Sequence, residues 1–225
     1  MSTRLFRSWL DPGHGMTGYF VAFEGIDKSG KSTQADRLAD ELNRDGRTVT
    51  LTREPGGTEL GRGIRRLLLE EPGDVDPLAE LFLFTADRAQ HVASVIRPGL
   101  DQGHVVISDR FSGSTIAYQG YGRGLDVGDL KRLQRLATGG VTPDLTIVVD
   151  VDVQTSRSRK ESDIADRVEG DDDSFFERVR QGYLEMVKAD PMGTVCLDGR
   201  LPIDELSNRI YLEVNRRLES EKGAP

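Results

Sequence analysis

Short apolar runs alternate along this chain with longer stretches in which apolar residues recur every three or four positions. The first run, Tyr19–Glu24, is apolar at almost every position and stops at Gly25. Runs of this kind are typical of parallel strands that are buried on both faces. We expect such strands at 19–24, 48–52, 105–108, 145–149 and 194–197.

The stretches between these runs have a helical repeat. In 32–44, Leu38 and Leu42 share one face, and Asp45-Gly46 ends the pattern as a helix terminus would. Similar patterns predict helices at 60–70, 77–96 and 203–218. Strands that alternate with helices form parallel βαβ units with right-handed crossovers. The sequence therefore predicts an α/β fold of three layers, in which helices flank a five-stranded parallel sheet.

The residues before the first strand have a different composition. Residues 1–18 are rich in glycine and contain no apolar segment of about 7–15 residues, which a secretory signal requires. We expect a flexible extension at 1–18, within which Met16 offers an alternative start. A single domain at 19–225 follows, because 225 residues suffice for one well-buried core.

Composition and charge narrow the class of protein. No apolar run approaches the roughly 20 residues of a membrane helix, and a net charge of −8 argues against a general affinity for nucleic acid. The chain has a single cysteine, Cys196, so it cannot form an internal disulfide, which suits the cytoplasm. The apolar neighbours of Cys196 predict a buried thiol. His14, His91 and His104 lack metal-ligand spacing, so we expect structural or surface roles for them.

The sharpest motif is a glycine-rich loop directly after the first strand. Residues 25–32 read Gly-Ile-Asp-Lys-Ser-Gly-Lys-Ser, which fits the phosphate-binding pattern G-x-x-x-x-G-K-[ST]. Glycines let backbone N–H groups converge on phosphate oxygens, and the dipole of the following helix adds positive potential. Lys31 is predicted to reach the β- and γ-phosphates of a nucleotide, and Ser32 to bind Mg²⁺.

This loop alone leaves the reaction open, because GTPases, motor ATPases and small-molecule kinases all share it. The N-K-x-D string with which GTPases recognise guanine is absent from the sequence. The choice among the remaining classes depends on the motifs that follow the second and third strands.

Two candidate acceptor motifs come next. Arg53 begins the string Arg-Glu-Pro-Gly-Gly-Thr after the second strand, where ligands of open α/β sheets bind; it suits a second phosphate, with an ordinary surface loop as the alternative. Phe84 and Arg88 share a face of one predicted helix and are candidates to stack on and hydrogen-bond a base. Taken alone, however, this pair favours a core phenylalanine with a surface arginine.

A third motif follows the third strand. Asp109 is a candidate Mg²⁺ ligand there, directly or through water, and Arg110 is a candidate contact to the transferring phosphate. Small or polar side chains able to read a base edge come next, at Ser114, Thr115, Tyr118 and Gln119.

Together these strings resemble the thymidylate kinase family of P-loop nucleoside monophosphate kinases. The resemblance rests on FEGIDKSGKSTQ at 23–34, TREPGGT at 52–58, LFLFTADR at 81–88, SDRFSGSTIAYQGYGRG at 108–124 and a basic segment followed by Asp166-Arg167. It implies an enzyme that uses Mg²⁺ and transfers the γ-phosphoryl of ATP to dTMP, giving dTDP for dTTP biosynthesis. It also implies a cytoplasmic homodimer.

The resemblance implies a role for each matching position. The residues that would bind ATP are Gly25, Ile26, Asp27, Lys28, Ser29, Gly30, Lys31, Ser32 and Thr33. The residues that would bind the acceptor are Asp27 at the 3′-hydroxyl, Phe84 on the thymine ring, Arg88 and Thr115 at its polar edge, Tyr118 against the 2′ position, Arg53 and Arg110 on the phosphate, with Ser114, Gln119 and Tyr183 nearby. Asp109 would assist Mg²⁺ beside Ser32.

A lid that closes over ATP is implied at about 154–172. The candidate catalytic residues are Arg157, Arg159 and Arg167 of this lid, with Lys28, Lys31, Asp109 and Arg110. In the family, a basic loop residue and lid arginines tend to be alternatives, whereas this sequence has both. It also has Phe111 where the family commonly has tyrosine.

Two other functions stay open on the sequence alone. A related kinase would act on another deoxynucleotide or a deoxynucleoside, although the arginines at 53, 88 and 110 favour an acceptor that already carries a phosphate. A P-loop nucleotide-binding switch is the alternative from another class, and it has no need of a second phosphate pocket. We expect neither a nucleic-acid nor a membrane partner.

Overall fold

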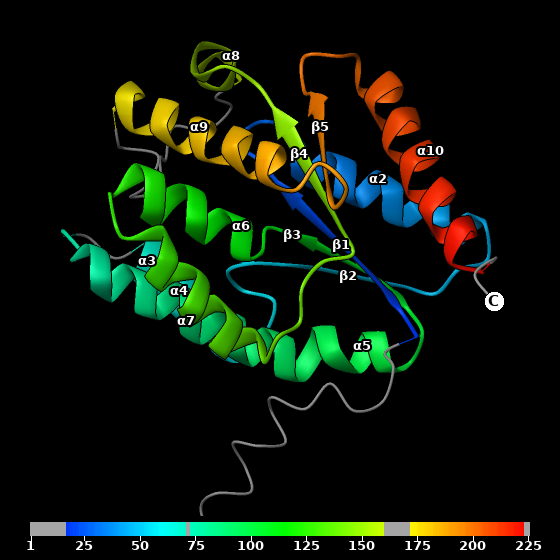
Figure 1. Ribbon diagram of the computed structural model, residues 1–225, viewed down its shortest axis with the longest axis horizontal. Coiled ribbons are helices and arrows are strands. Elements are labelled where there is room, and N and C mark those ends of the chain that lie inside the picture. The colour runs from blue at the N-terminus through cyan, green and yellow to red at the C-terminus, as the bar shows by residue number, and fades with distance from the viewer. Residues whose placement is uncertain (1–16, 71–72, 160–171, 223–225) are drawn as a thin grey trace, which may run out of the picture.

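The computed structural model describes residues 17–70, 73–159 and 172–222 (Figure 1). Residues 1–16 of the expected extension and 160–171 of the expected lid, including Arg167, lie outside the described residues. Within the described part of the chain, no helix combines the length and the apolar character needed to cross a membrane.

One parallel sheet forms the centre of the fold, as predicted. Its strands are β1 (Tyr19–Glu24), β2 (Val49–Arg53), β3 (Val105–Asp109), β4 (Leu145–Asp150) and β5 (Thr194–Asp198). Their order across the sheet is β2-β3-β1-β4-β5, and all neighbours run parallel. Each predicted strand is confirmed to within one residue at either end. Arg53 and Asp109, expected just after their strands, are the last residues of β2 and β3.

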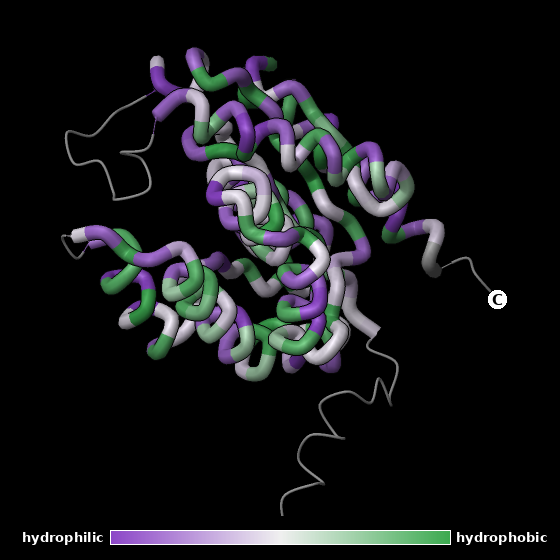
Figure 2. Tube along the Cα trace, turned by 60° about the vertical axis from the view of Figure 1, so that its left-hand side comes forward, coloured by the Kyte–Doolittle hydropathy of each residue, from purple (hydrophilic) through white to green (hydrophobic). Residues whose placement is uncertain are grey.

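Helices cover both faces of the sheet. They are α2 (Lys31–Arg44), α3 (Glu59–Leu69), α4 (Pro77–His91), α5 (Arg97–Asp101), α6 (Ser112–Thr115), α7 (Val127–Thr138), α8 (Val153–Ser158), α9 (Asp173–Ala189) and α10 (Ile203–Lys222), with π-helical turns η1 (Val92–Ile96) and η2 (Ile116–Gly122). In Figure 1, α2 and α10 lie on one side of the sheet and the other long helices on the opposite side. Hydrophobic and hydrophilic segments alternate along these helices (Figure 2), as expected of helices with one buried face.

The alternation of side chains along β1 and β3 decides which residues reach which layer. Val21 and Phe23 of β1 pack in the core under α2 and α10, whereas Phe20 and Ala22 pack in the core on the opposite face. Because successive side chains of a strand point to opposite faces, Glu24 shares the face of Phe20 and Ala22. By the same rule, Asp109 of β3 faces α2.

One predicted helix is longer than expected. The pattern at 77–96 predicts an end at Ile96, but the helix continues through the turn η1 into α5 and passes Pro98. Proline lacks an N–H, and its ring clashes with the carbonyl four residues earlier in a regular helix. The wider π-helical turn that precedes Pro98 contains that carbonyl. The helix therefore continues past Pro98, where the rule that proline ends a helix would stop it.

The prediction that Cys196 is a buried thiol is wrong, because its side chain is exposed. Cys196 lies on β5, which is an edge strand and has a neighbouring strand on one side only. An apolar run does not reveal whether its strand is central or at an edge, and that position decides the exposure here.

Close packing between α9 and η2 gives a stability prediction. A Cβ atom at Gly182 would lie 2.8 Å from Cδ2 of Tyr121 and 3.1 Å from the backbone Cα of Ala117, whereas one at Gly63 of α3 would meet nothing within 4 Å. We expect Gly182→Ala to lower the free energy of unfolding by about 1–3 kcal/mol through overpacking. The matched change Gly63→Ala should raise it by about 0.5–1 kcal/mol through helix propensity. Urea denaturation measures both, and equal effects at the two positions would contradict the packing argument.

Candidate active site

The predicted phosphate loop links β1 to α2, which is the context that the motif requires. Gly25 has a φ of 142° and Gly30 a φ of 102°, both in the region that side chains disfavour. A Cβ atom at Gly25 would lie 2.5 Å from the carbonyl oxygen of Val149 on β4. The backbone therefore turns tightly against the sheet, and Gly30 caps the N-terminus of α2.

Lys31 is held inside this loop. Its side chain is buried, its Nζ donates to the carbonyl oxygen of Ile26 at 3.2 Å, and it lies 3.9 Å from Oδ1 of Asp27. Burial, followed by the positive charge of Arg110, lowers the pKa of Lys31, while nearby carboxylates raise it. A bound polyphosphate would add negative charge at this point and favour the ammonium form.

A pair of oxygen ligands lies beside the loop. Ser32 Oγ donates to Oδ2 of Asp109 at 2.5 Å, joining the start of α2 to the end of β3. The other oxygen, Asp109 Oδ1, is buried and has no hydrogen-bond partner among the described residues. A hydroxyl and a carboxylate with unused acceptor capacity are ligands that Mg²⁺ accepts. The two predicted metal ligands therefore meet, and their donor set fits the ion.

Arg110 is the centre of the polar network on the opposite face of the sheet. Its φ of 73° is uncommon for a residue other than glycine and marks a constrained backbone. Its Nη2 contacts Oδ1 of Asp27 and donates to the hydroxyl of Tyr118 at 3.2 Å, while Tyr118 donates to Asp27 Oδ2 at 2.8 Å. Burial alone would raise the pKa of Asp27, but Arg110 and Lys31 lower it to about 2. Asp27 is therefore a carboxylate at neutral pH.

The other side of Arg110 contacts two hydroxyls. Its Nη1 donates to Ser114 Oγ at 3.0 Å and to the hydroxyl of Tyr183 at 3.2 Å. Both hydroxyls also contact Glu24, whose Oε2 accepts from Ser114 Oγ at 2.6 Å and from Tyr183 at 3.2 Å. Burial raises the pKa of Glu24, opposed by the hydrogen bond from Ser114 and by the positive charge of Arg110. Glu24, which the sequence did not single out, thus holds two predicted site residues, Ser114 and Tyr183, beside Arg110.

Arg88 is buried, with 1% of its surface exposed, whereas Phe84 is half-buried and lines a pocket. The interpretation that this pair alone favours, a core phenylalanine with a surface arginine, is therefore wrong. Arg88 Nε donates to Oε2 of Glu54 at 2.8 Å, and Nη1 donates to Thr115 Oγ1 at 2.8 Å. Nη1 also contacts Gln134 Oε1, and Nη2 donates to the carbonyl oxygen of Phe111 at 2.9 Å. These partners compensate the charge in the interior.

Most predicted acceptor residues line one pocket, with about 630 Å³ of empty space open to solvent. The predicted residues in its wall are Asp27, Phe84, Arg88, Arg110, Ser114, Thr115, Tyr118 and Gln119. Tyr183 is not among the lining residues, but it touches Arg110 and Ser114 behind them. Arg53 is exposed and lines a neighbouring cavity together with Ser32 and Asp109. The structure therefore places Arg53 on the metal-ligand side, apart from the main pocket.

The two described lid arginines point to different elements. Arg159 donates from Nη1 to the carbonyl oxygens of Lys28 and Ser29, at 3.3 and 3.1 Å, and from Nη2 to that of Gly199 at 2.8 Å. Arg157 lies over the ring of Phe176 and its Nε donates to Asp173 Oδ1 at 3.2 Å. Arg159 thus lies against the phosphate loop, whereas Arg157 lies against α9.

Several residues of the site were missed from the sequence. Arg65 lines the pocket and donates to the carbonyl oxygen of Pro55 at 3.2 Å. Arg65 lies four residues before Leu69, which also lines the pocket, so the two share one face of α3. That shared face was the signal available in the sequence. Glu54, which lies between Arg53 and Pro55, was given no role, although a carboxylate at a strand end was a candidate partner for Arg88. Gln134 gave no signal, because its role depends on how α7 packs.

Two further buried groups, His91 and Asp87, lie beside Glu54. His91 Nδ1 lies 2.8 Å from Glu54 Oε1, and His91 Nε2 lies 2.7 Å from Thr52 Oγ1, which confirms a structural role for this histidine. Asp87 Oδ1 accepts from the backbone N–H of Gly56 at 3.2 Å. The other oxygen of Asp87 is buried and without a hydrogen-bond partner among the described residues.

Comparison with known proteins gives a consistent result. A sequence model of the thymidylate kinase family matches residues 23–210. The chain is 49% identical over 180 residues to a thymidylate kinase of Prochlorococcus marinus (strain MIT 9313), covering 77% of this chain and 83% of that protein. It is 44% identical over 203 residues to a thymidylate kinase of Leifsonia xyli subsp. xyli, covering 89% and 96%.

A solved structure has the same fold. The crystal structure of thymidylate kinase from Ehrlichia chaffeensis superimposes with a TM-score of 0.72 at 38% sequence identity. The superposition covers 90% of this chain and 98% of that one.

The environment of Asp87 generates a pH-dependent stability prediction. Burial, followed by the negative charge of Glu54, raises the pKa of Asp87 from 3.8 to about 6. The protonated form therefore contributes stability that is fully present below pH 3.8 and is lost as the pH rises through about 6. Asparagine resembles the protonated acid, so Asp87→Asn should gain up to about 3 kcal/mol over the native chain at pH 8 and little at pH 4. Urea unfolding of both proteins at several pH values tests this, and parallel stability curves would contradict it.

Proposed function

We propose how this site works from one premise, that the chain belongs to the thymidylate kinase family and phosphorylates dTMP to dTDP in dTTP biosynthesis. The single observation that carries the proposal is the position of a phosphate loop and a polar pocket on either side of the β1 end. Asp27 touches both, because it lies beside Lys31 and bonds to Tyr118 in the pocket wall. The donor and the acceptor would thus meet at Asp27.

The loop would bind the phosphates of ATP. Its members are Gly25, Ile26, Asp27, Lys28, Ser29, Gly30, Lys31, Ser32 and Thr33. The N-terminus of α2 and the turn at Gly30 support this assignment, since both direct backbone N–H groups toward an anion. Lys31 is placed to exchange its carbonyl partner for phosphate oxygens.

Ser32 and Asp109 are the residues that would hold Mg²⁺. When bound, this ion would neutralise the negative charge that develops on the phosphates during transfer. The buried Oδ1 of Asp109 supports the assignment, since an unpaired carboxylate oxygen in the interior is costly without a cation nearby. Arg53, in the cavity beside them, would contact the phosphate oxygens from the β2 side.

The main pocket would bind dTMP. Phe84 would stack on thymine, and Arg88, Thr115 and Gln119 would contact its polar edge. The Asp27 carboxylate would accept from the 3′-hydroxyl, while the ring of Tyr118, fixed by its hydrogen bond to Asp27, would occupy the space a 2′-hydroxyl needs.

Arg110 would bind the acceptor phosphate, with Ser114 and Tyr183 holding its guanidinium in place.

The transfer step would depend on placement and on cancelled charge, with no covalent intermediate on the protein. Lys31 and Arg110 approach the reacting phosphates from opposite sides of β1. Among the described lid arginines, Arg159 is the one that contacts the phosphate loop, so we assign it the supporting role beside Lys28. Arg157 would act from the α9 side, and Arg167 belongs to the part of the lid outside the described residues.

The chain would function as one kinase domain over 19–225 with a lid at about 154–172, preceded by an extension at 1–18. α8, at the base of this lid, touches the phosphate loop, because Ser156 Oγ donates to the carbonyl oxygen of Asp27 at 2.8 Å. Closure of the lid would exclude water from the transferring phosphoryl group. A cytoplasmic location agrees with the use of ATP and with the single cysteine of the sequence.

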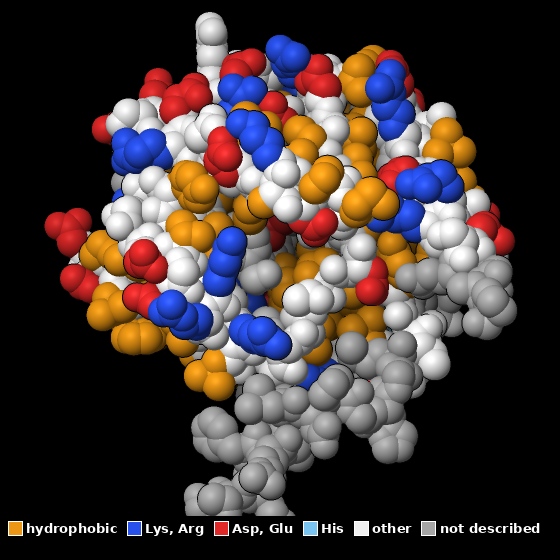
Figure 3. Space-filling model, viewed as in Figure 1, with side chains coloured by type: hydrophobic (Ala, Val, Ile, Leu, Met, Phe, Trp, Pro, Cys, Tyr) orange, Lys and Arg blue, Asp and Glu red, His pale blue; other side chains and the backbone are white. Residues whose placement is uncertain are grey.

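Two adjacent helices support a homodimer. Leu60 and Leu67 lie seven residues apart on α3, and Leu78 and Phe82 lie four apart on α4, so each pair shares a helix face. All four side chains are exposed, although α3 and α4 pack against each other. Figure 3 shows hydrophobic side chains gathered at its lower left, where Figure 1 has α3, α4 and α7. Apolar surface of this kind is typical of protein interfaces, and a second copy of the chain would cover it.

The activity is tested by coupled ADP release from ATP with Mg²⁺ and a panel of deoxynucleoside monophosphates, with thymidine as the unphosphorylated acceptor. We expect dTMP to give the highest kcat/KM, and Lys31→Ala to lower kcat at least about 100-fold through lost charge stabilisation. Removal of Mg²⁺ by EDTA should stop the reaction. A preference for thymidine over dTMP, or no response to either, would reject the assignment of the pocket.

The dimer is tested by sedimentation velocity. Phe82→Glu should convert a dimer to a monomer, because it places a charge in the apolar contact. Leu212→Glu on α10, an equally exposed position far from α3 and α4 in the fold, should leave the dimer intact. A native chain that sediments as a monomer, or a dimer unaffected by Phe82→Glu, would rule out this interface.

A further inference from the structure

A buried carboxylate stands behind the wall of the main pocket. Glu80 of α4 is 1% exposed and does not line the pocket, and its Oε1 accepts a hydrogen bond from Gln119 Nε2 at 2.8 Å. A carboxylate accepts hydrogen bonds and donates none. The amide nitrogen of Gln119 must therefore face Glu80. Gln119 lines the pocket, so its carbonyl oxygen, on the side of the amide away from Glu80, is the group left to face the pocket.

A cation lies beside Glu80 on the side away from the pocket. Arg123 Nε lies 3.5 Å from the same Oε1, and the Arg123 side chain is largely buried. Its guanidinium lies 4.4 Å from the ring centre of Phe175 at the start of α9. This ion pair holds the Glu80 side chain in place behind the pocket wall. The orientation of the Gln119 amide is therefore set by electrostatics from outside the pocket.

Hydrogen-bond donors lie beside Gln119 in the pocket wall. Thr115 precedes Gln119 by four residues, and its Oγ1 accepts from Arg88 Nη1, so its own hydrogen is available to donate. Arg88 has five N–H groups, of which four have the partners described above. The fifth, on Nη2, has no hydrogen-bond partner among the described residues. The wall thus presents donors from Arg88 and Thr115 next to an acceptor from Gln119.

We propose that Glu80 is a positioning residue for base selection. By fixing the Gln119 amide, it makes the pocket accept pyrimidines that carry an N–H at position 3 and reject cytosine. The inference rests on the proposed function, in which this pocket binds the base of the acceptor nucleotide. It adds a selecting residue that itself contacts no substrate.

The chemistry of the bases explains why the pocket would accept thymine and uracil and reject cytosine. Thymine and uracil offer a carbonyl at position 4 and an N–H at position 3, which match a donor beside an acceptor. Cytosine offers an amino group and an unprotonated nitrogen at these positions. It would place its amino group against Arg88 and its nitrogen lone pair against the Gln119 oxygen. A buried site with fixed polarity discriminates strongly in this situation, because mismatched groups stay unpaired.

The test is Glu80→Gln, which keeps the shape of the side chain but can donate as well as accept. Gln119 is then free to rotate by half a turn and present its nitrogen to the pocket. We expect the ratio of kcat/KM for dCMP to that for dTMP to rise about 10-fold or more, as loss of one mismatched buried polar contact implies. The ratio of dUMP to dTMP should stay unchanged, since both bases carry the N3–H. A general loosening of the pocket would move both ratios.

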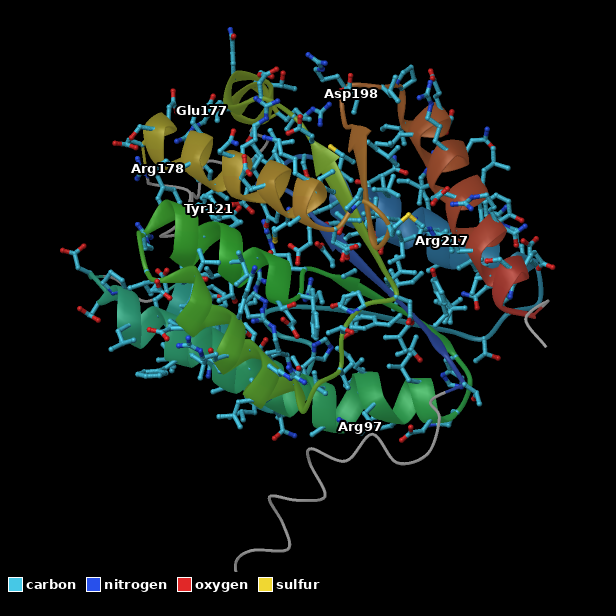
Figure 4. All side chains as sticks on the ribbon, in the orientation of Figure 1. Arg97, Tyr121, Glu177, Arg178, Asp198 and Arg217 are labelled. Carbon is cyan, nitrogen blue, oxygen red and sulfur yellow. The ribbon has the colours of Figure 1, made fainter. Side chains whose placement is uncertain are left out.

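Two further variants separate positioning from structure. Gln119→Ala should relax the dCMP to dTMP ratio to a similar extent, and Glu80→Gln should add no further change to that ratio in the double variant. Glu177→Gln is the matched control, because Glu177 is exposed near the outer end of α9 (Figure 4) and should leave every ratio unchanged. Thermal melting of each variant shows whether it folds. If Glu80→Gln does not fold, the dCMP to dTMP ratio of Gln119→Ala decides whether the amide selects the base.

The outcomes distinguish this inference from the proposed function. A native enzyme that prefers dTMP, with the dCMP to dTMP ratio unmoved by Glu80→Gln or by Gln119→Ala, overturns the role of Glu80 and leaves the pocket assignment intact. A native enzyme that does not prefer dTMP overturns the pocket assignment and the inference with it.

Discussion

The main pocket of this protein depends on one buried guanidinium. Arg88 carries a charge in the interior, and such a charge is tolerated only when carboxylates and carbonyls surround it. Its partners come from the β2 end (Glu54), from α6 (Thr115) and from α7 (Gln134), so satisfying Arg88 fixes these elements relative to α4. The same contacts define the pocket wall. The contacts that compensate the buried charge of Arg88 therefore also determine the shape of the pocket.

Much of the fold could be predicted because it depends on local pattern. The strands of the sheet follow from apolar runs, and the phosphate loop follows from a motif whose glycines are required by backbone geometry. What could not be predicted depends on the third dimension. The burial of Arg88 depends on partners 23 to 46 residues away, and the exposure of Cys196 depends on β5 being an edge strand. The continuation of the predicted helix past Ile96 into α5 depends on the π-helical turn η1, which no residue pattern indicated.

The candidate site divides in the same way. Residues in strings directly after strands, such as Lys31, Asp109 and Arg110, were located from the sequence because the ends of parallel strands converge. Arg53 was expected in the acceptor pocket and lies in the adjoining cavity, since the last residue of β2 points away from that pocket. Glu24, Glu80 and Gln134 escaped notice because they act through other residues. Supporting groups of this kind give no signal until their partners are known.

The alternation along β1 and β3 has an evolutionary consequence. Glu24 and Asp109 lie on opposite faces of the sheet, one behind the main pocket and the other beside the phosphate loop. A point substitution can change either half of the machinery alone. A single-residue insertion or deletion within β3 would instead turn Asp109 away from Ser32 and displace Arg110 in the same event. We therefore expect homologous chains to tolerate substitution at the other positions of β3, while the length of this strand stays constant.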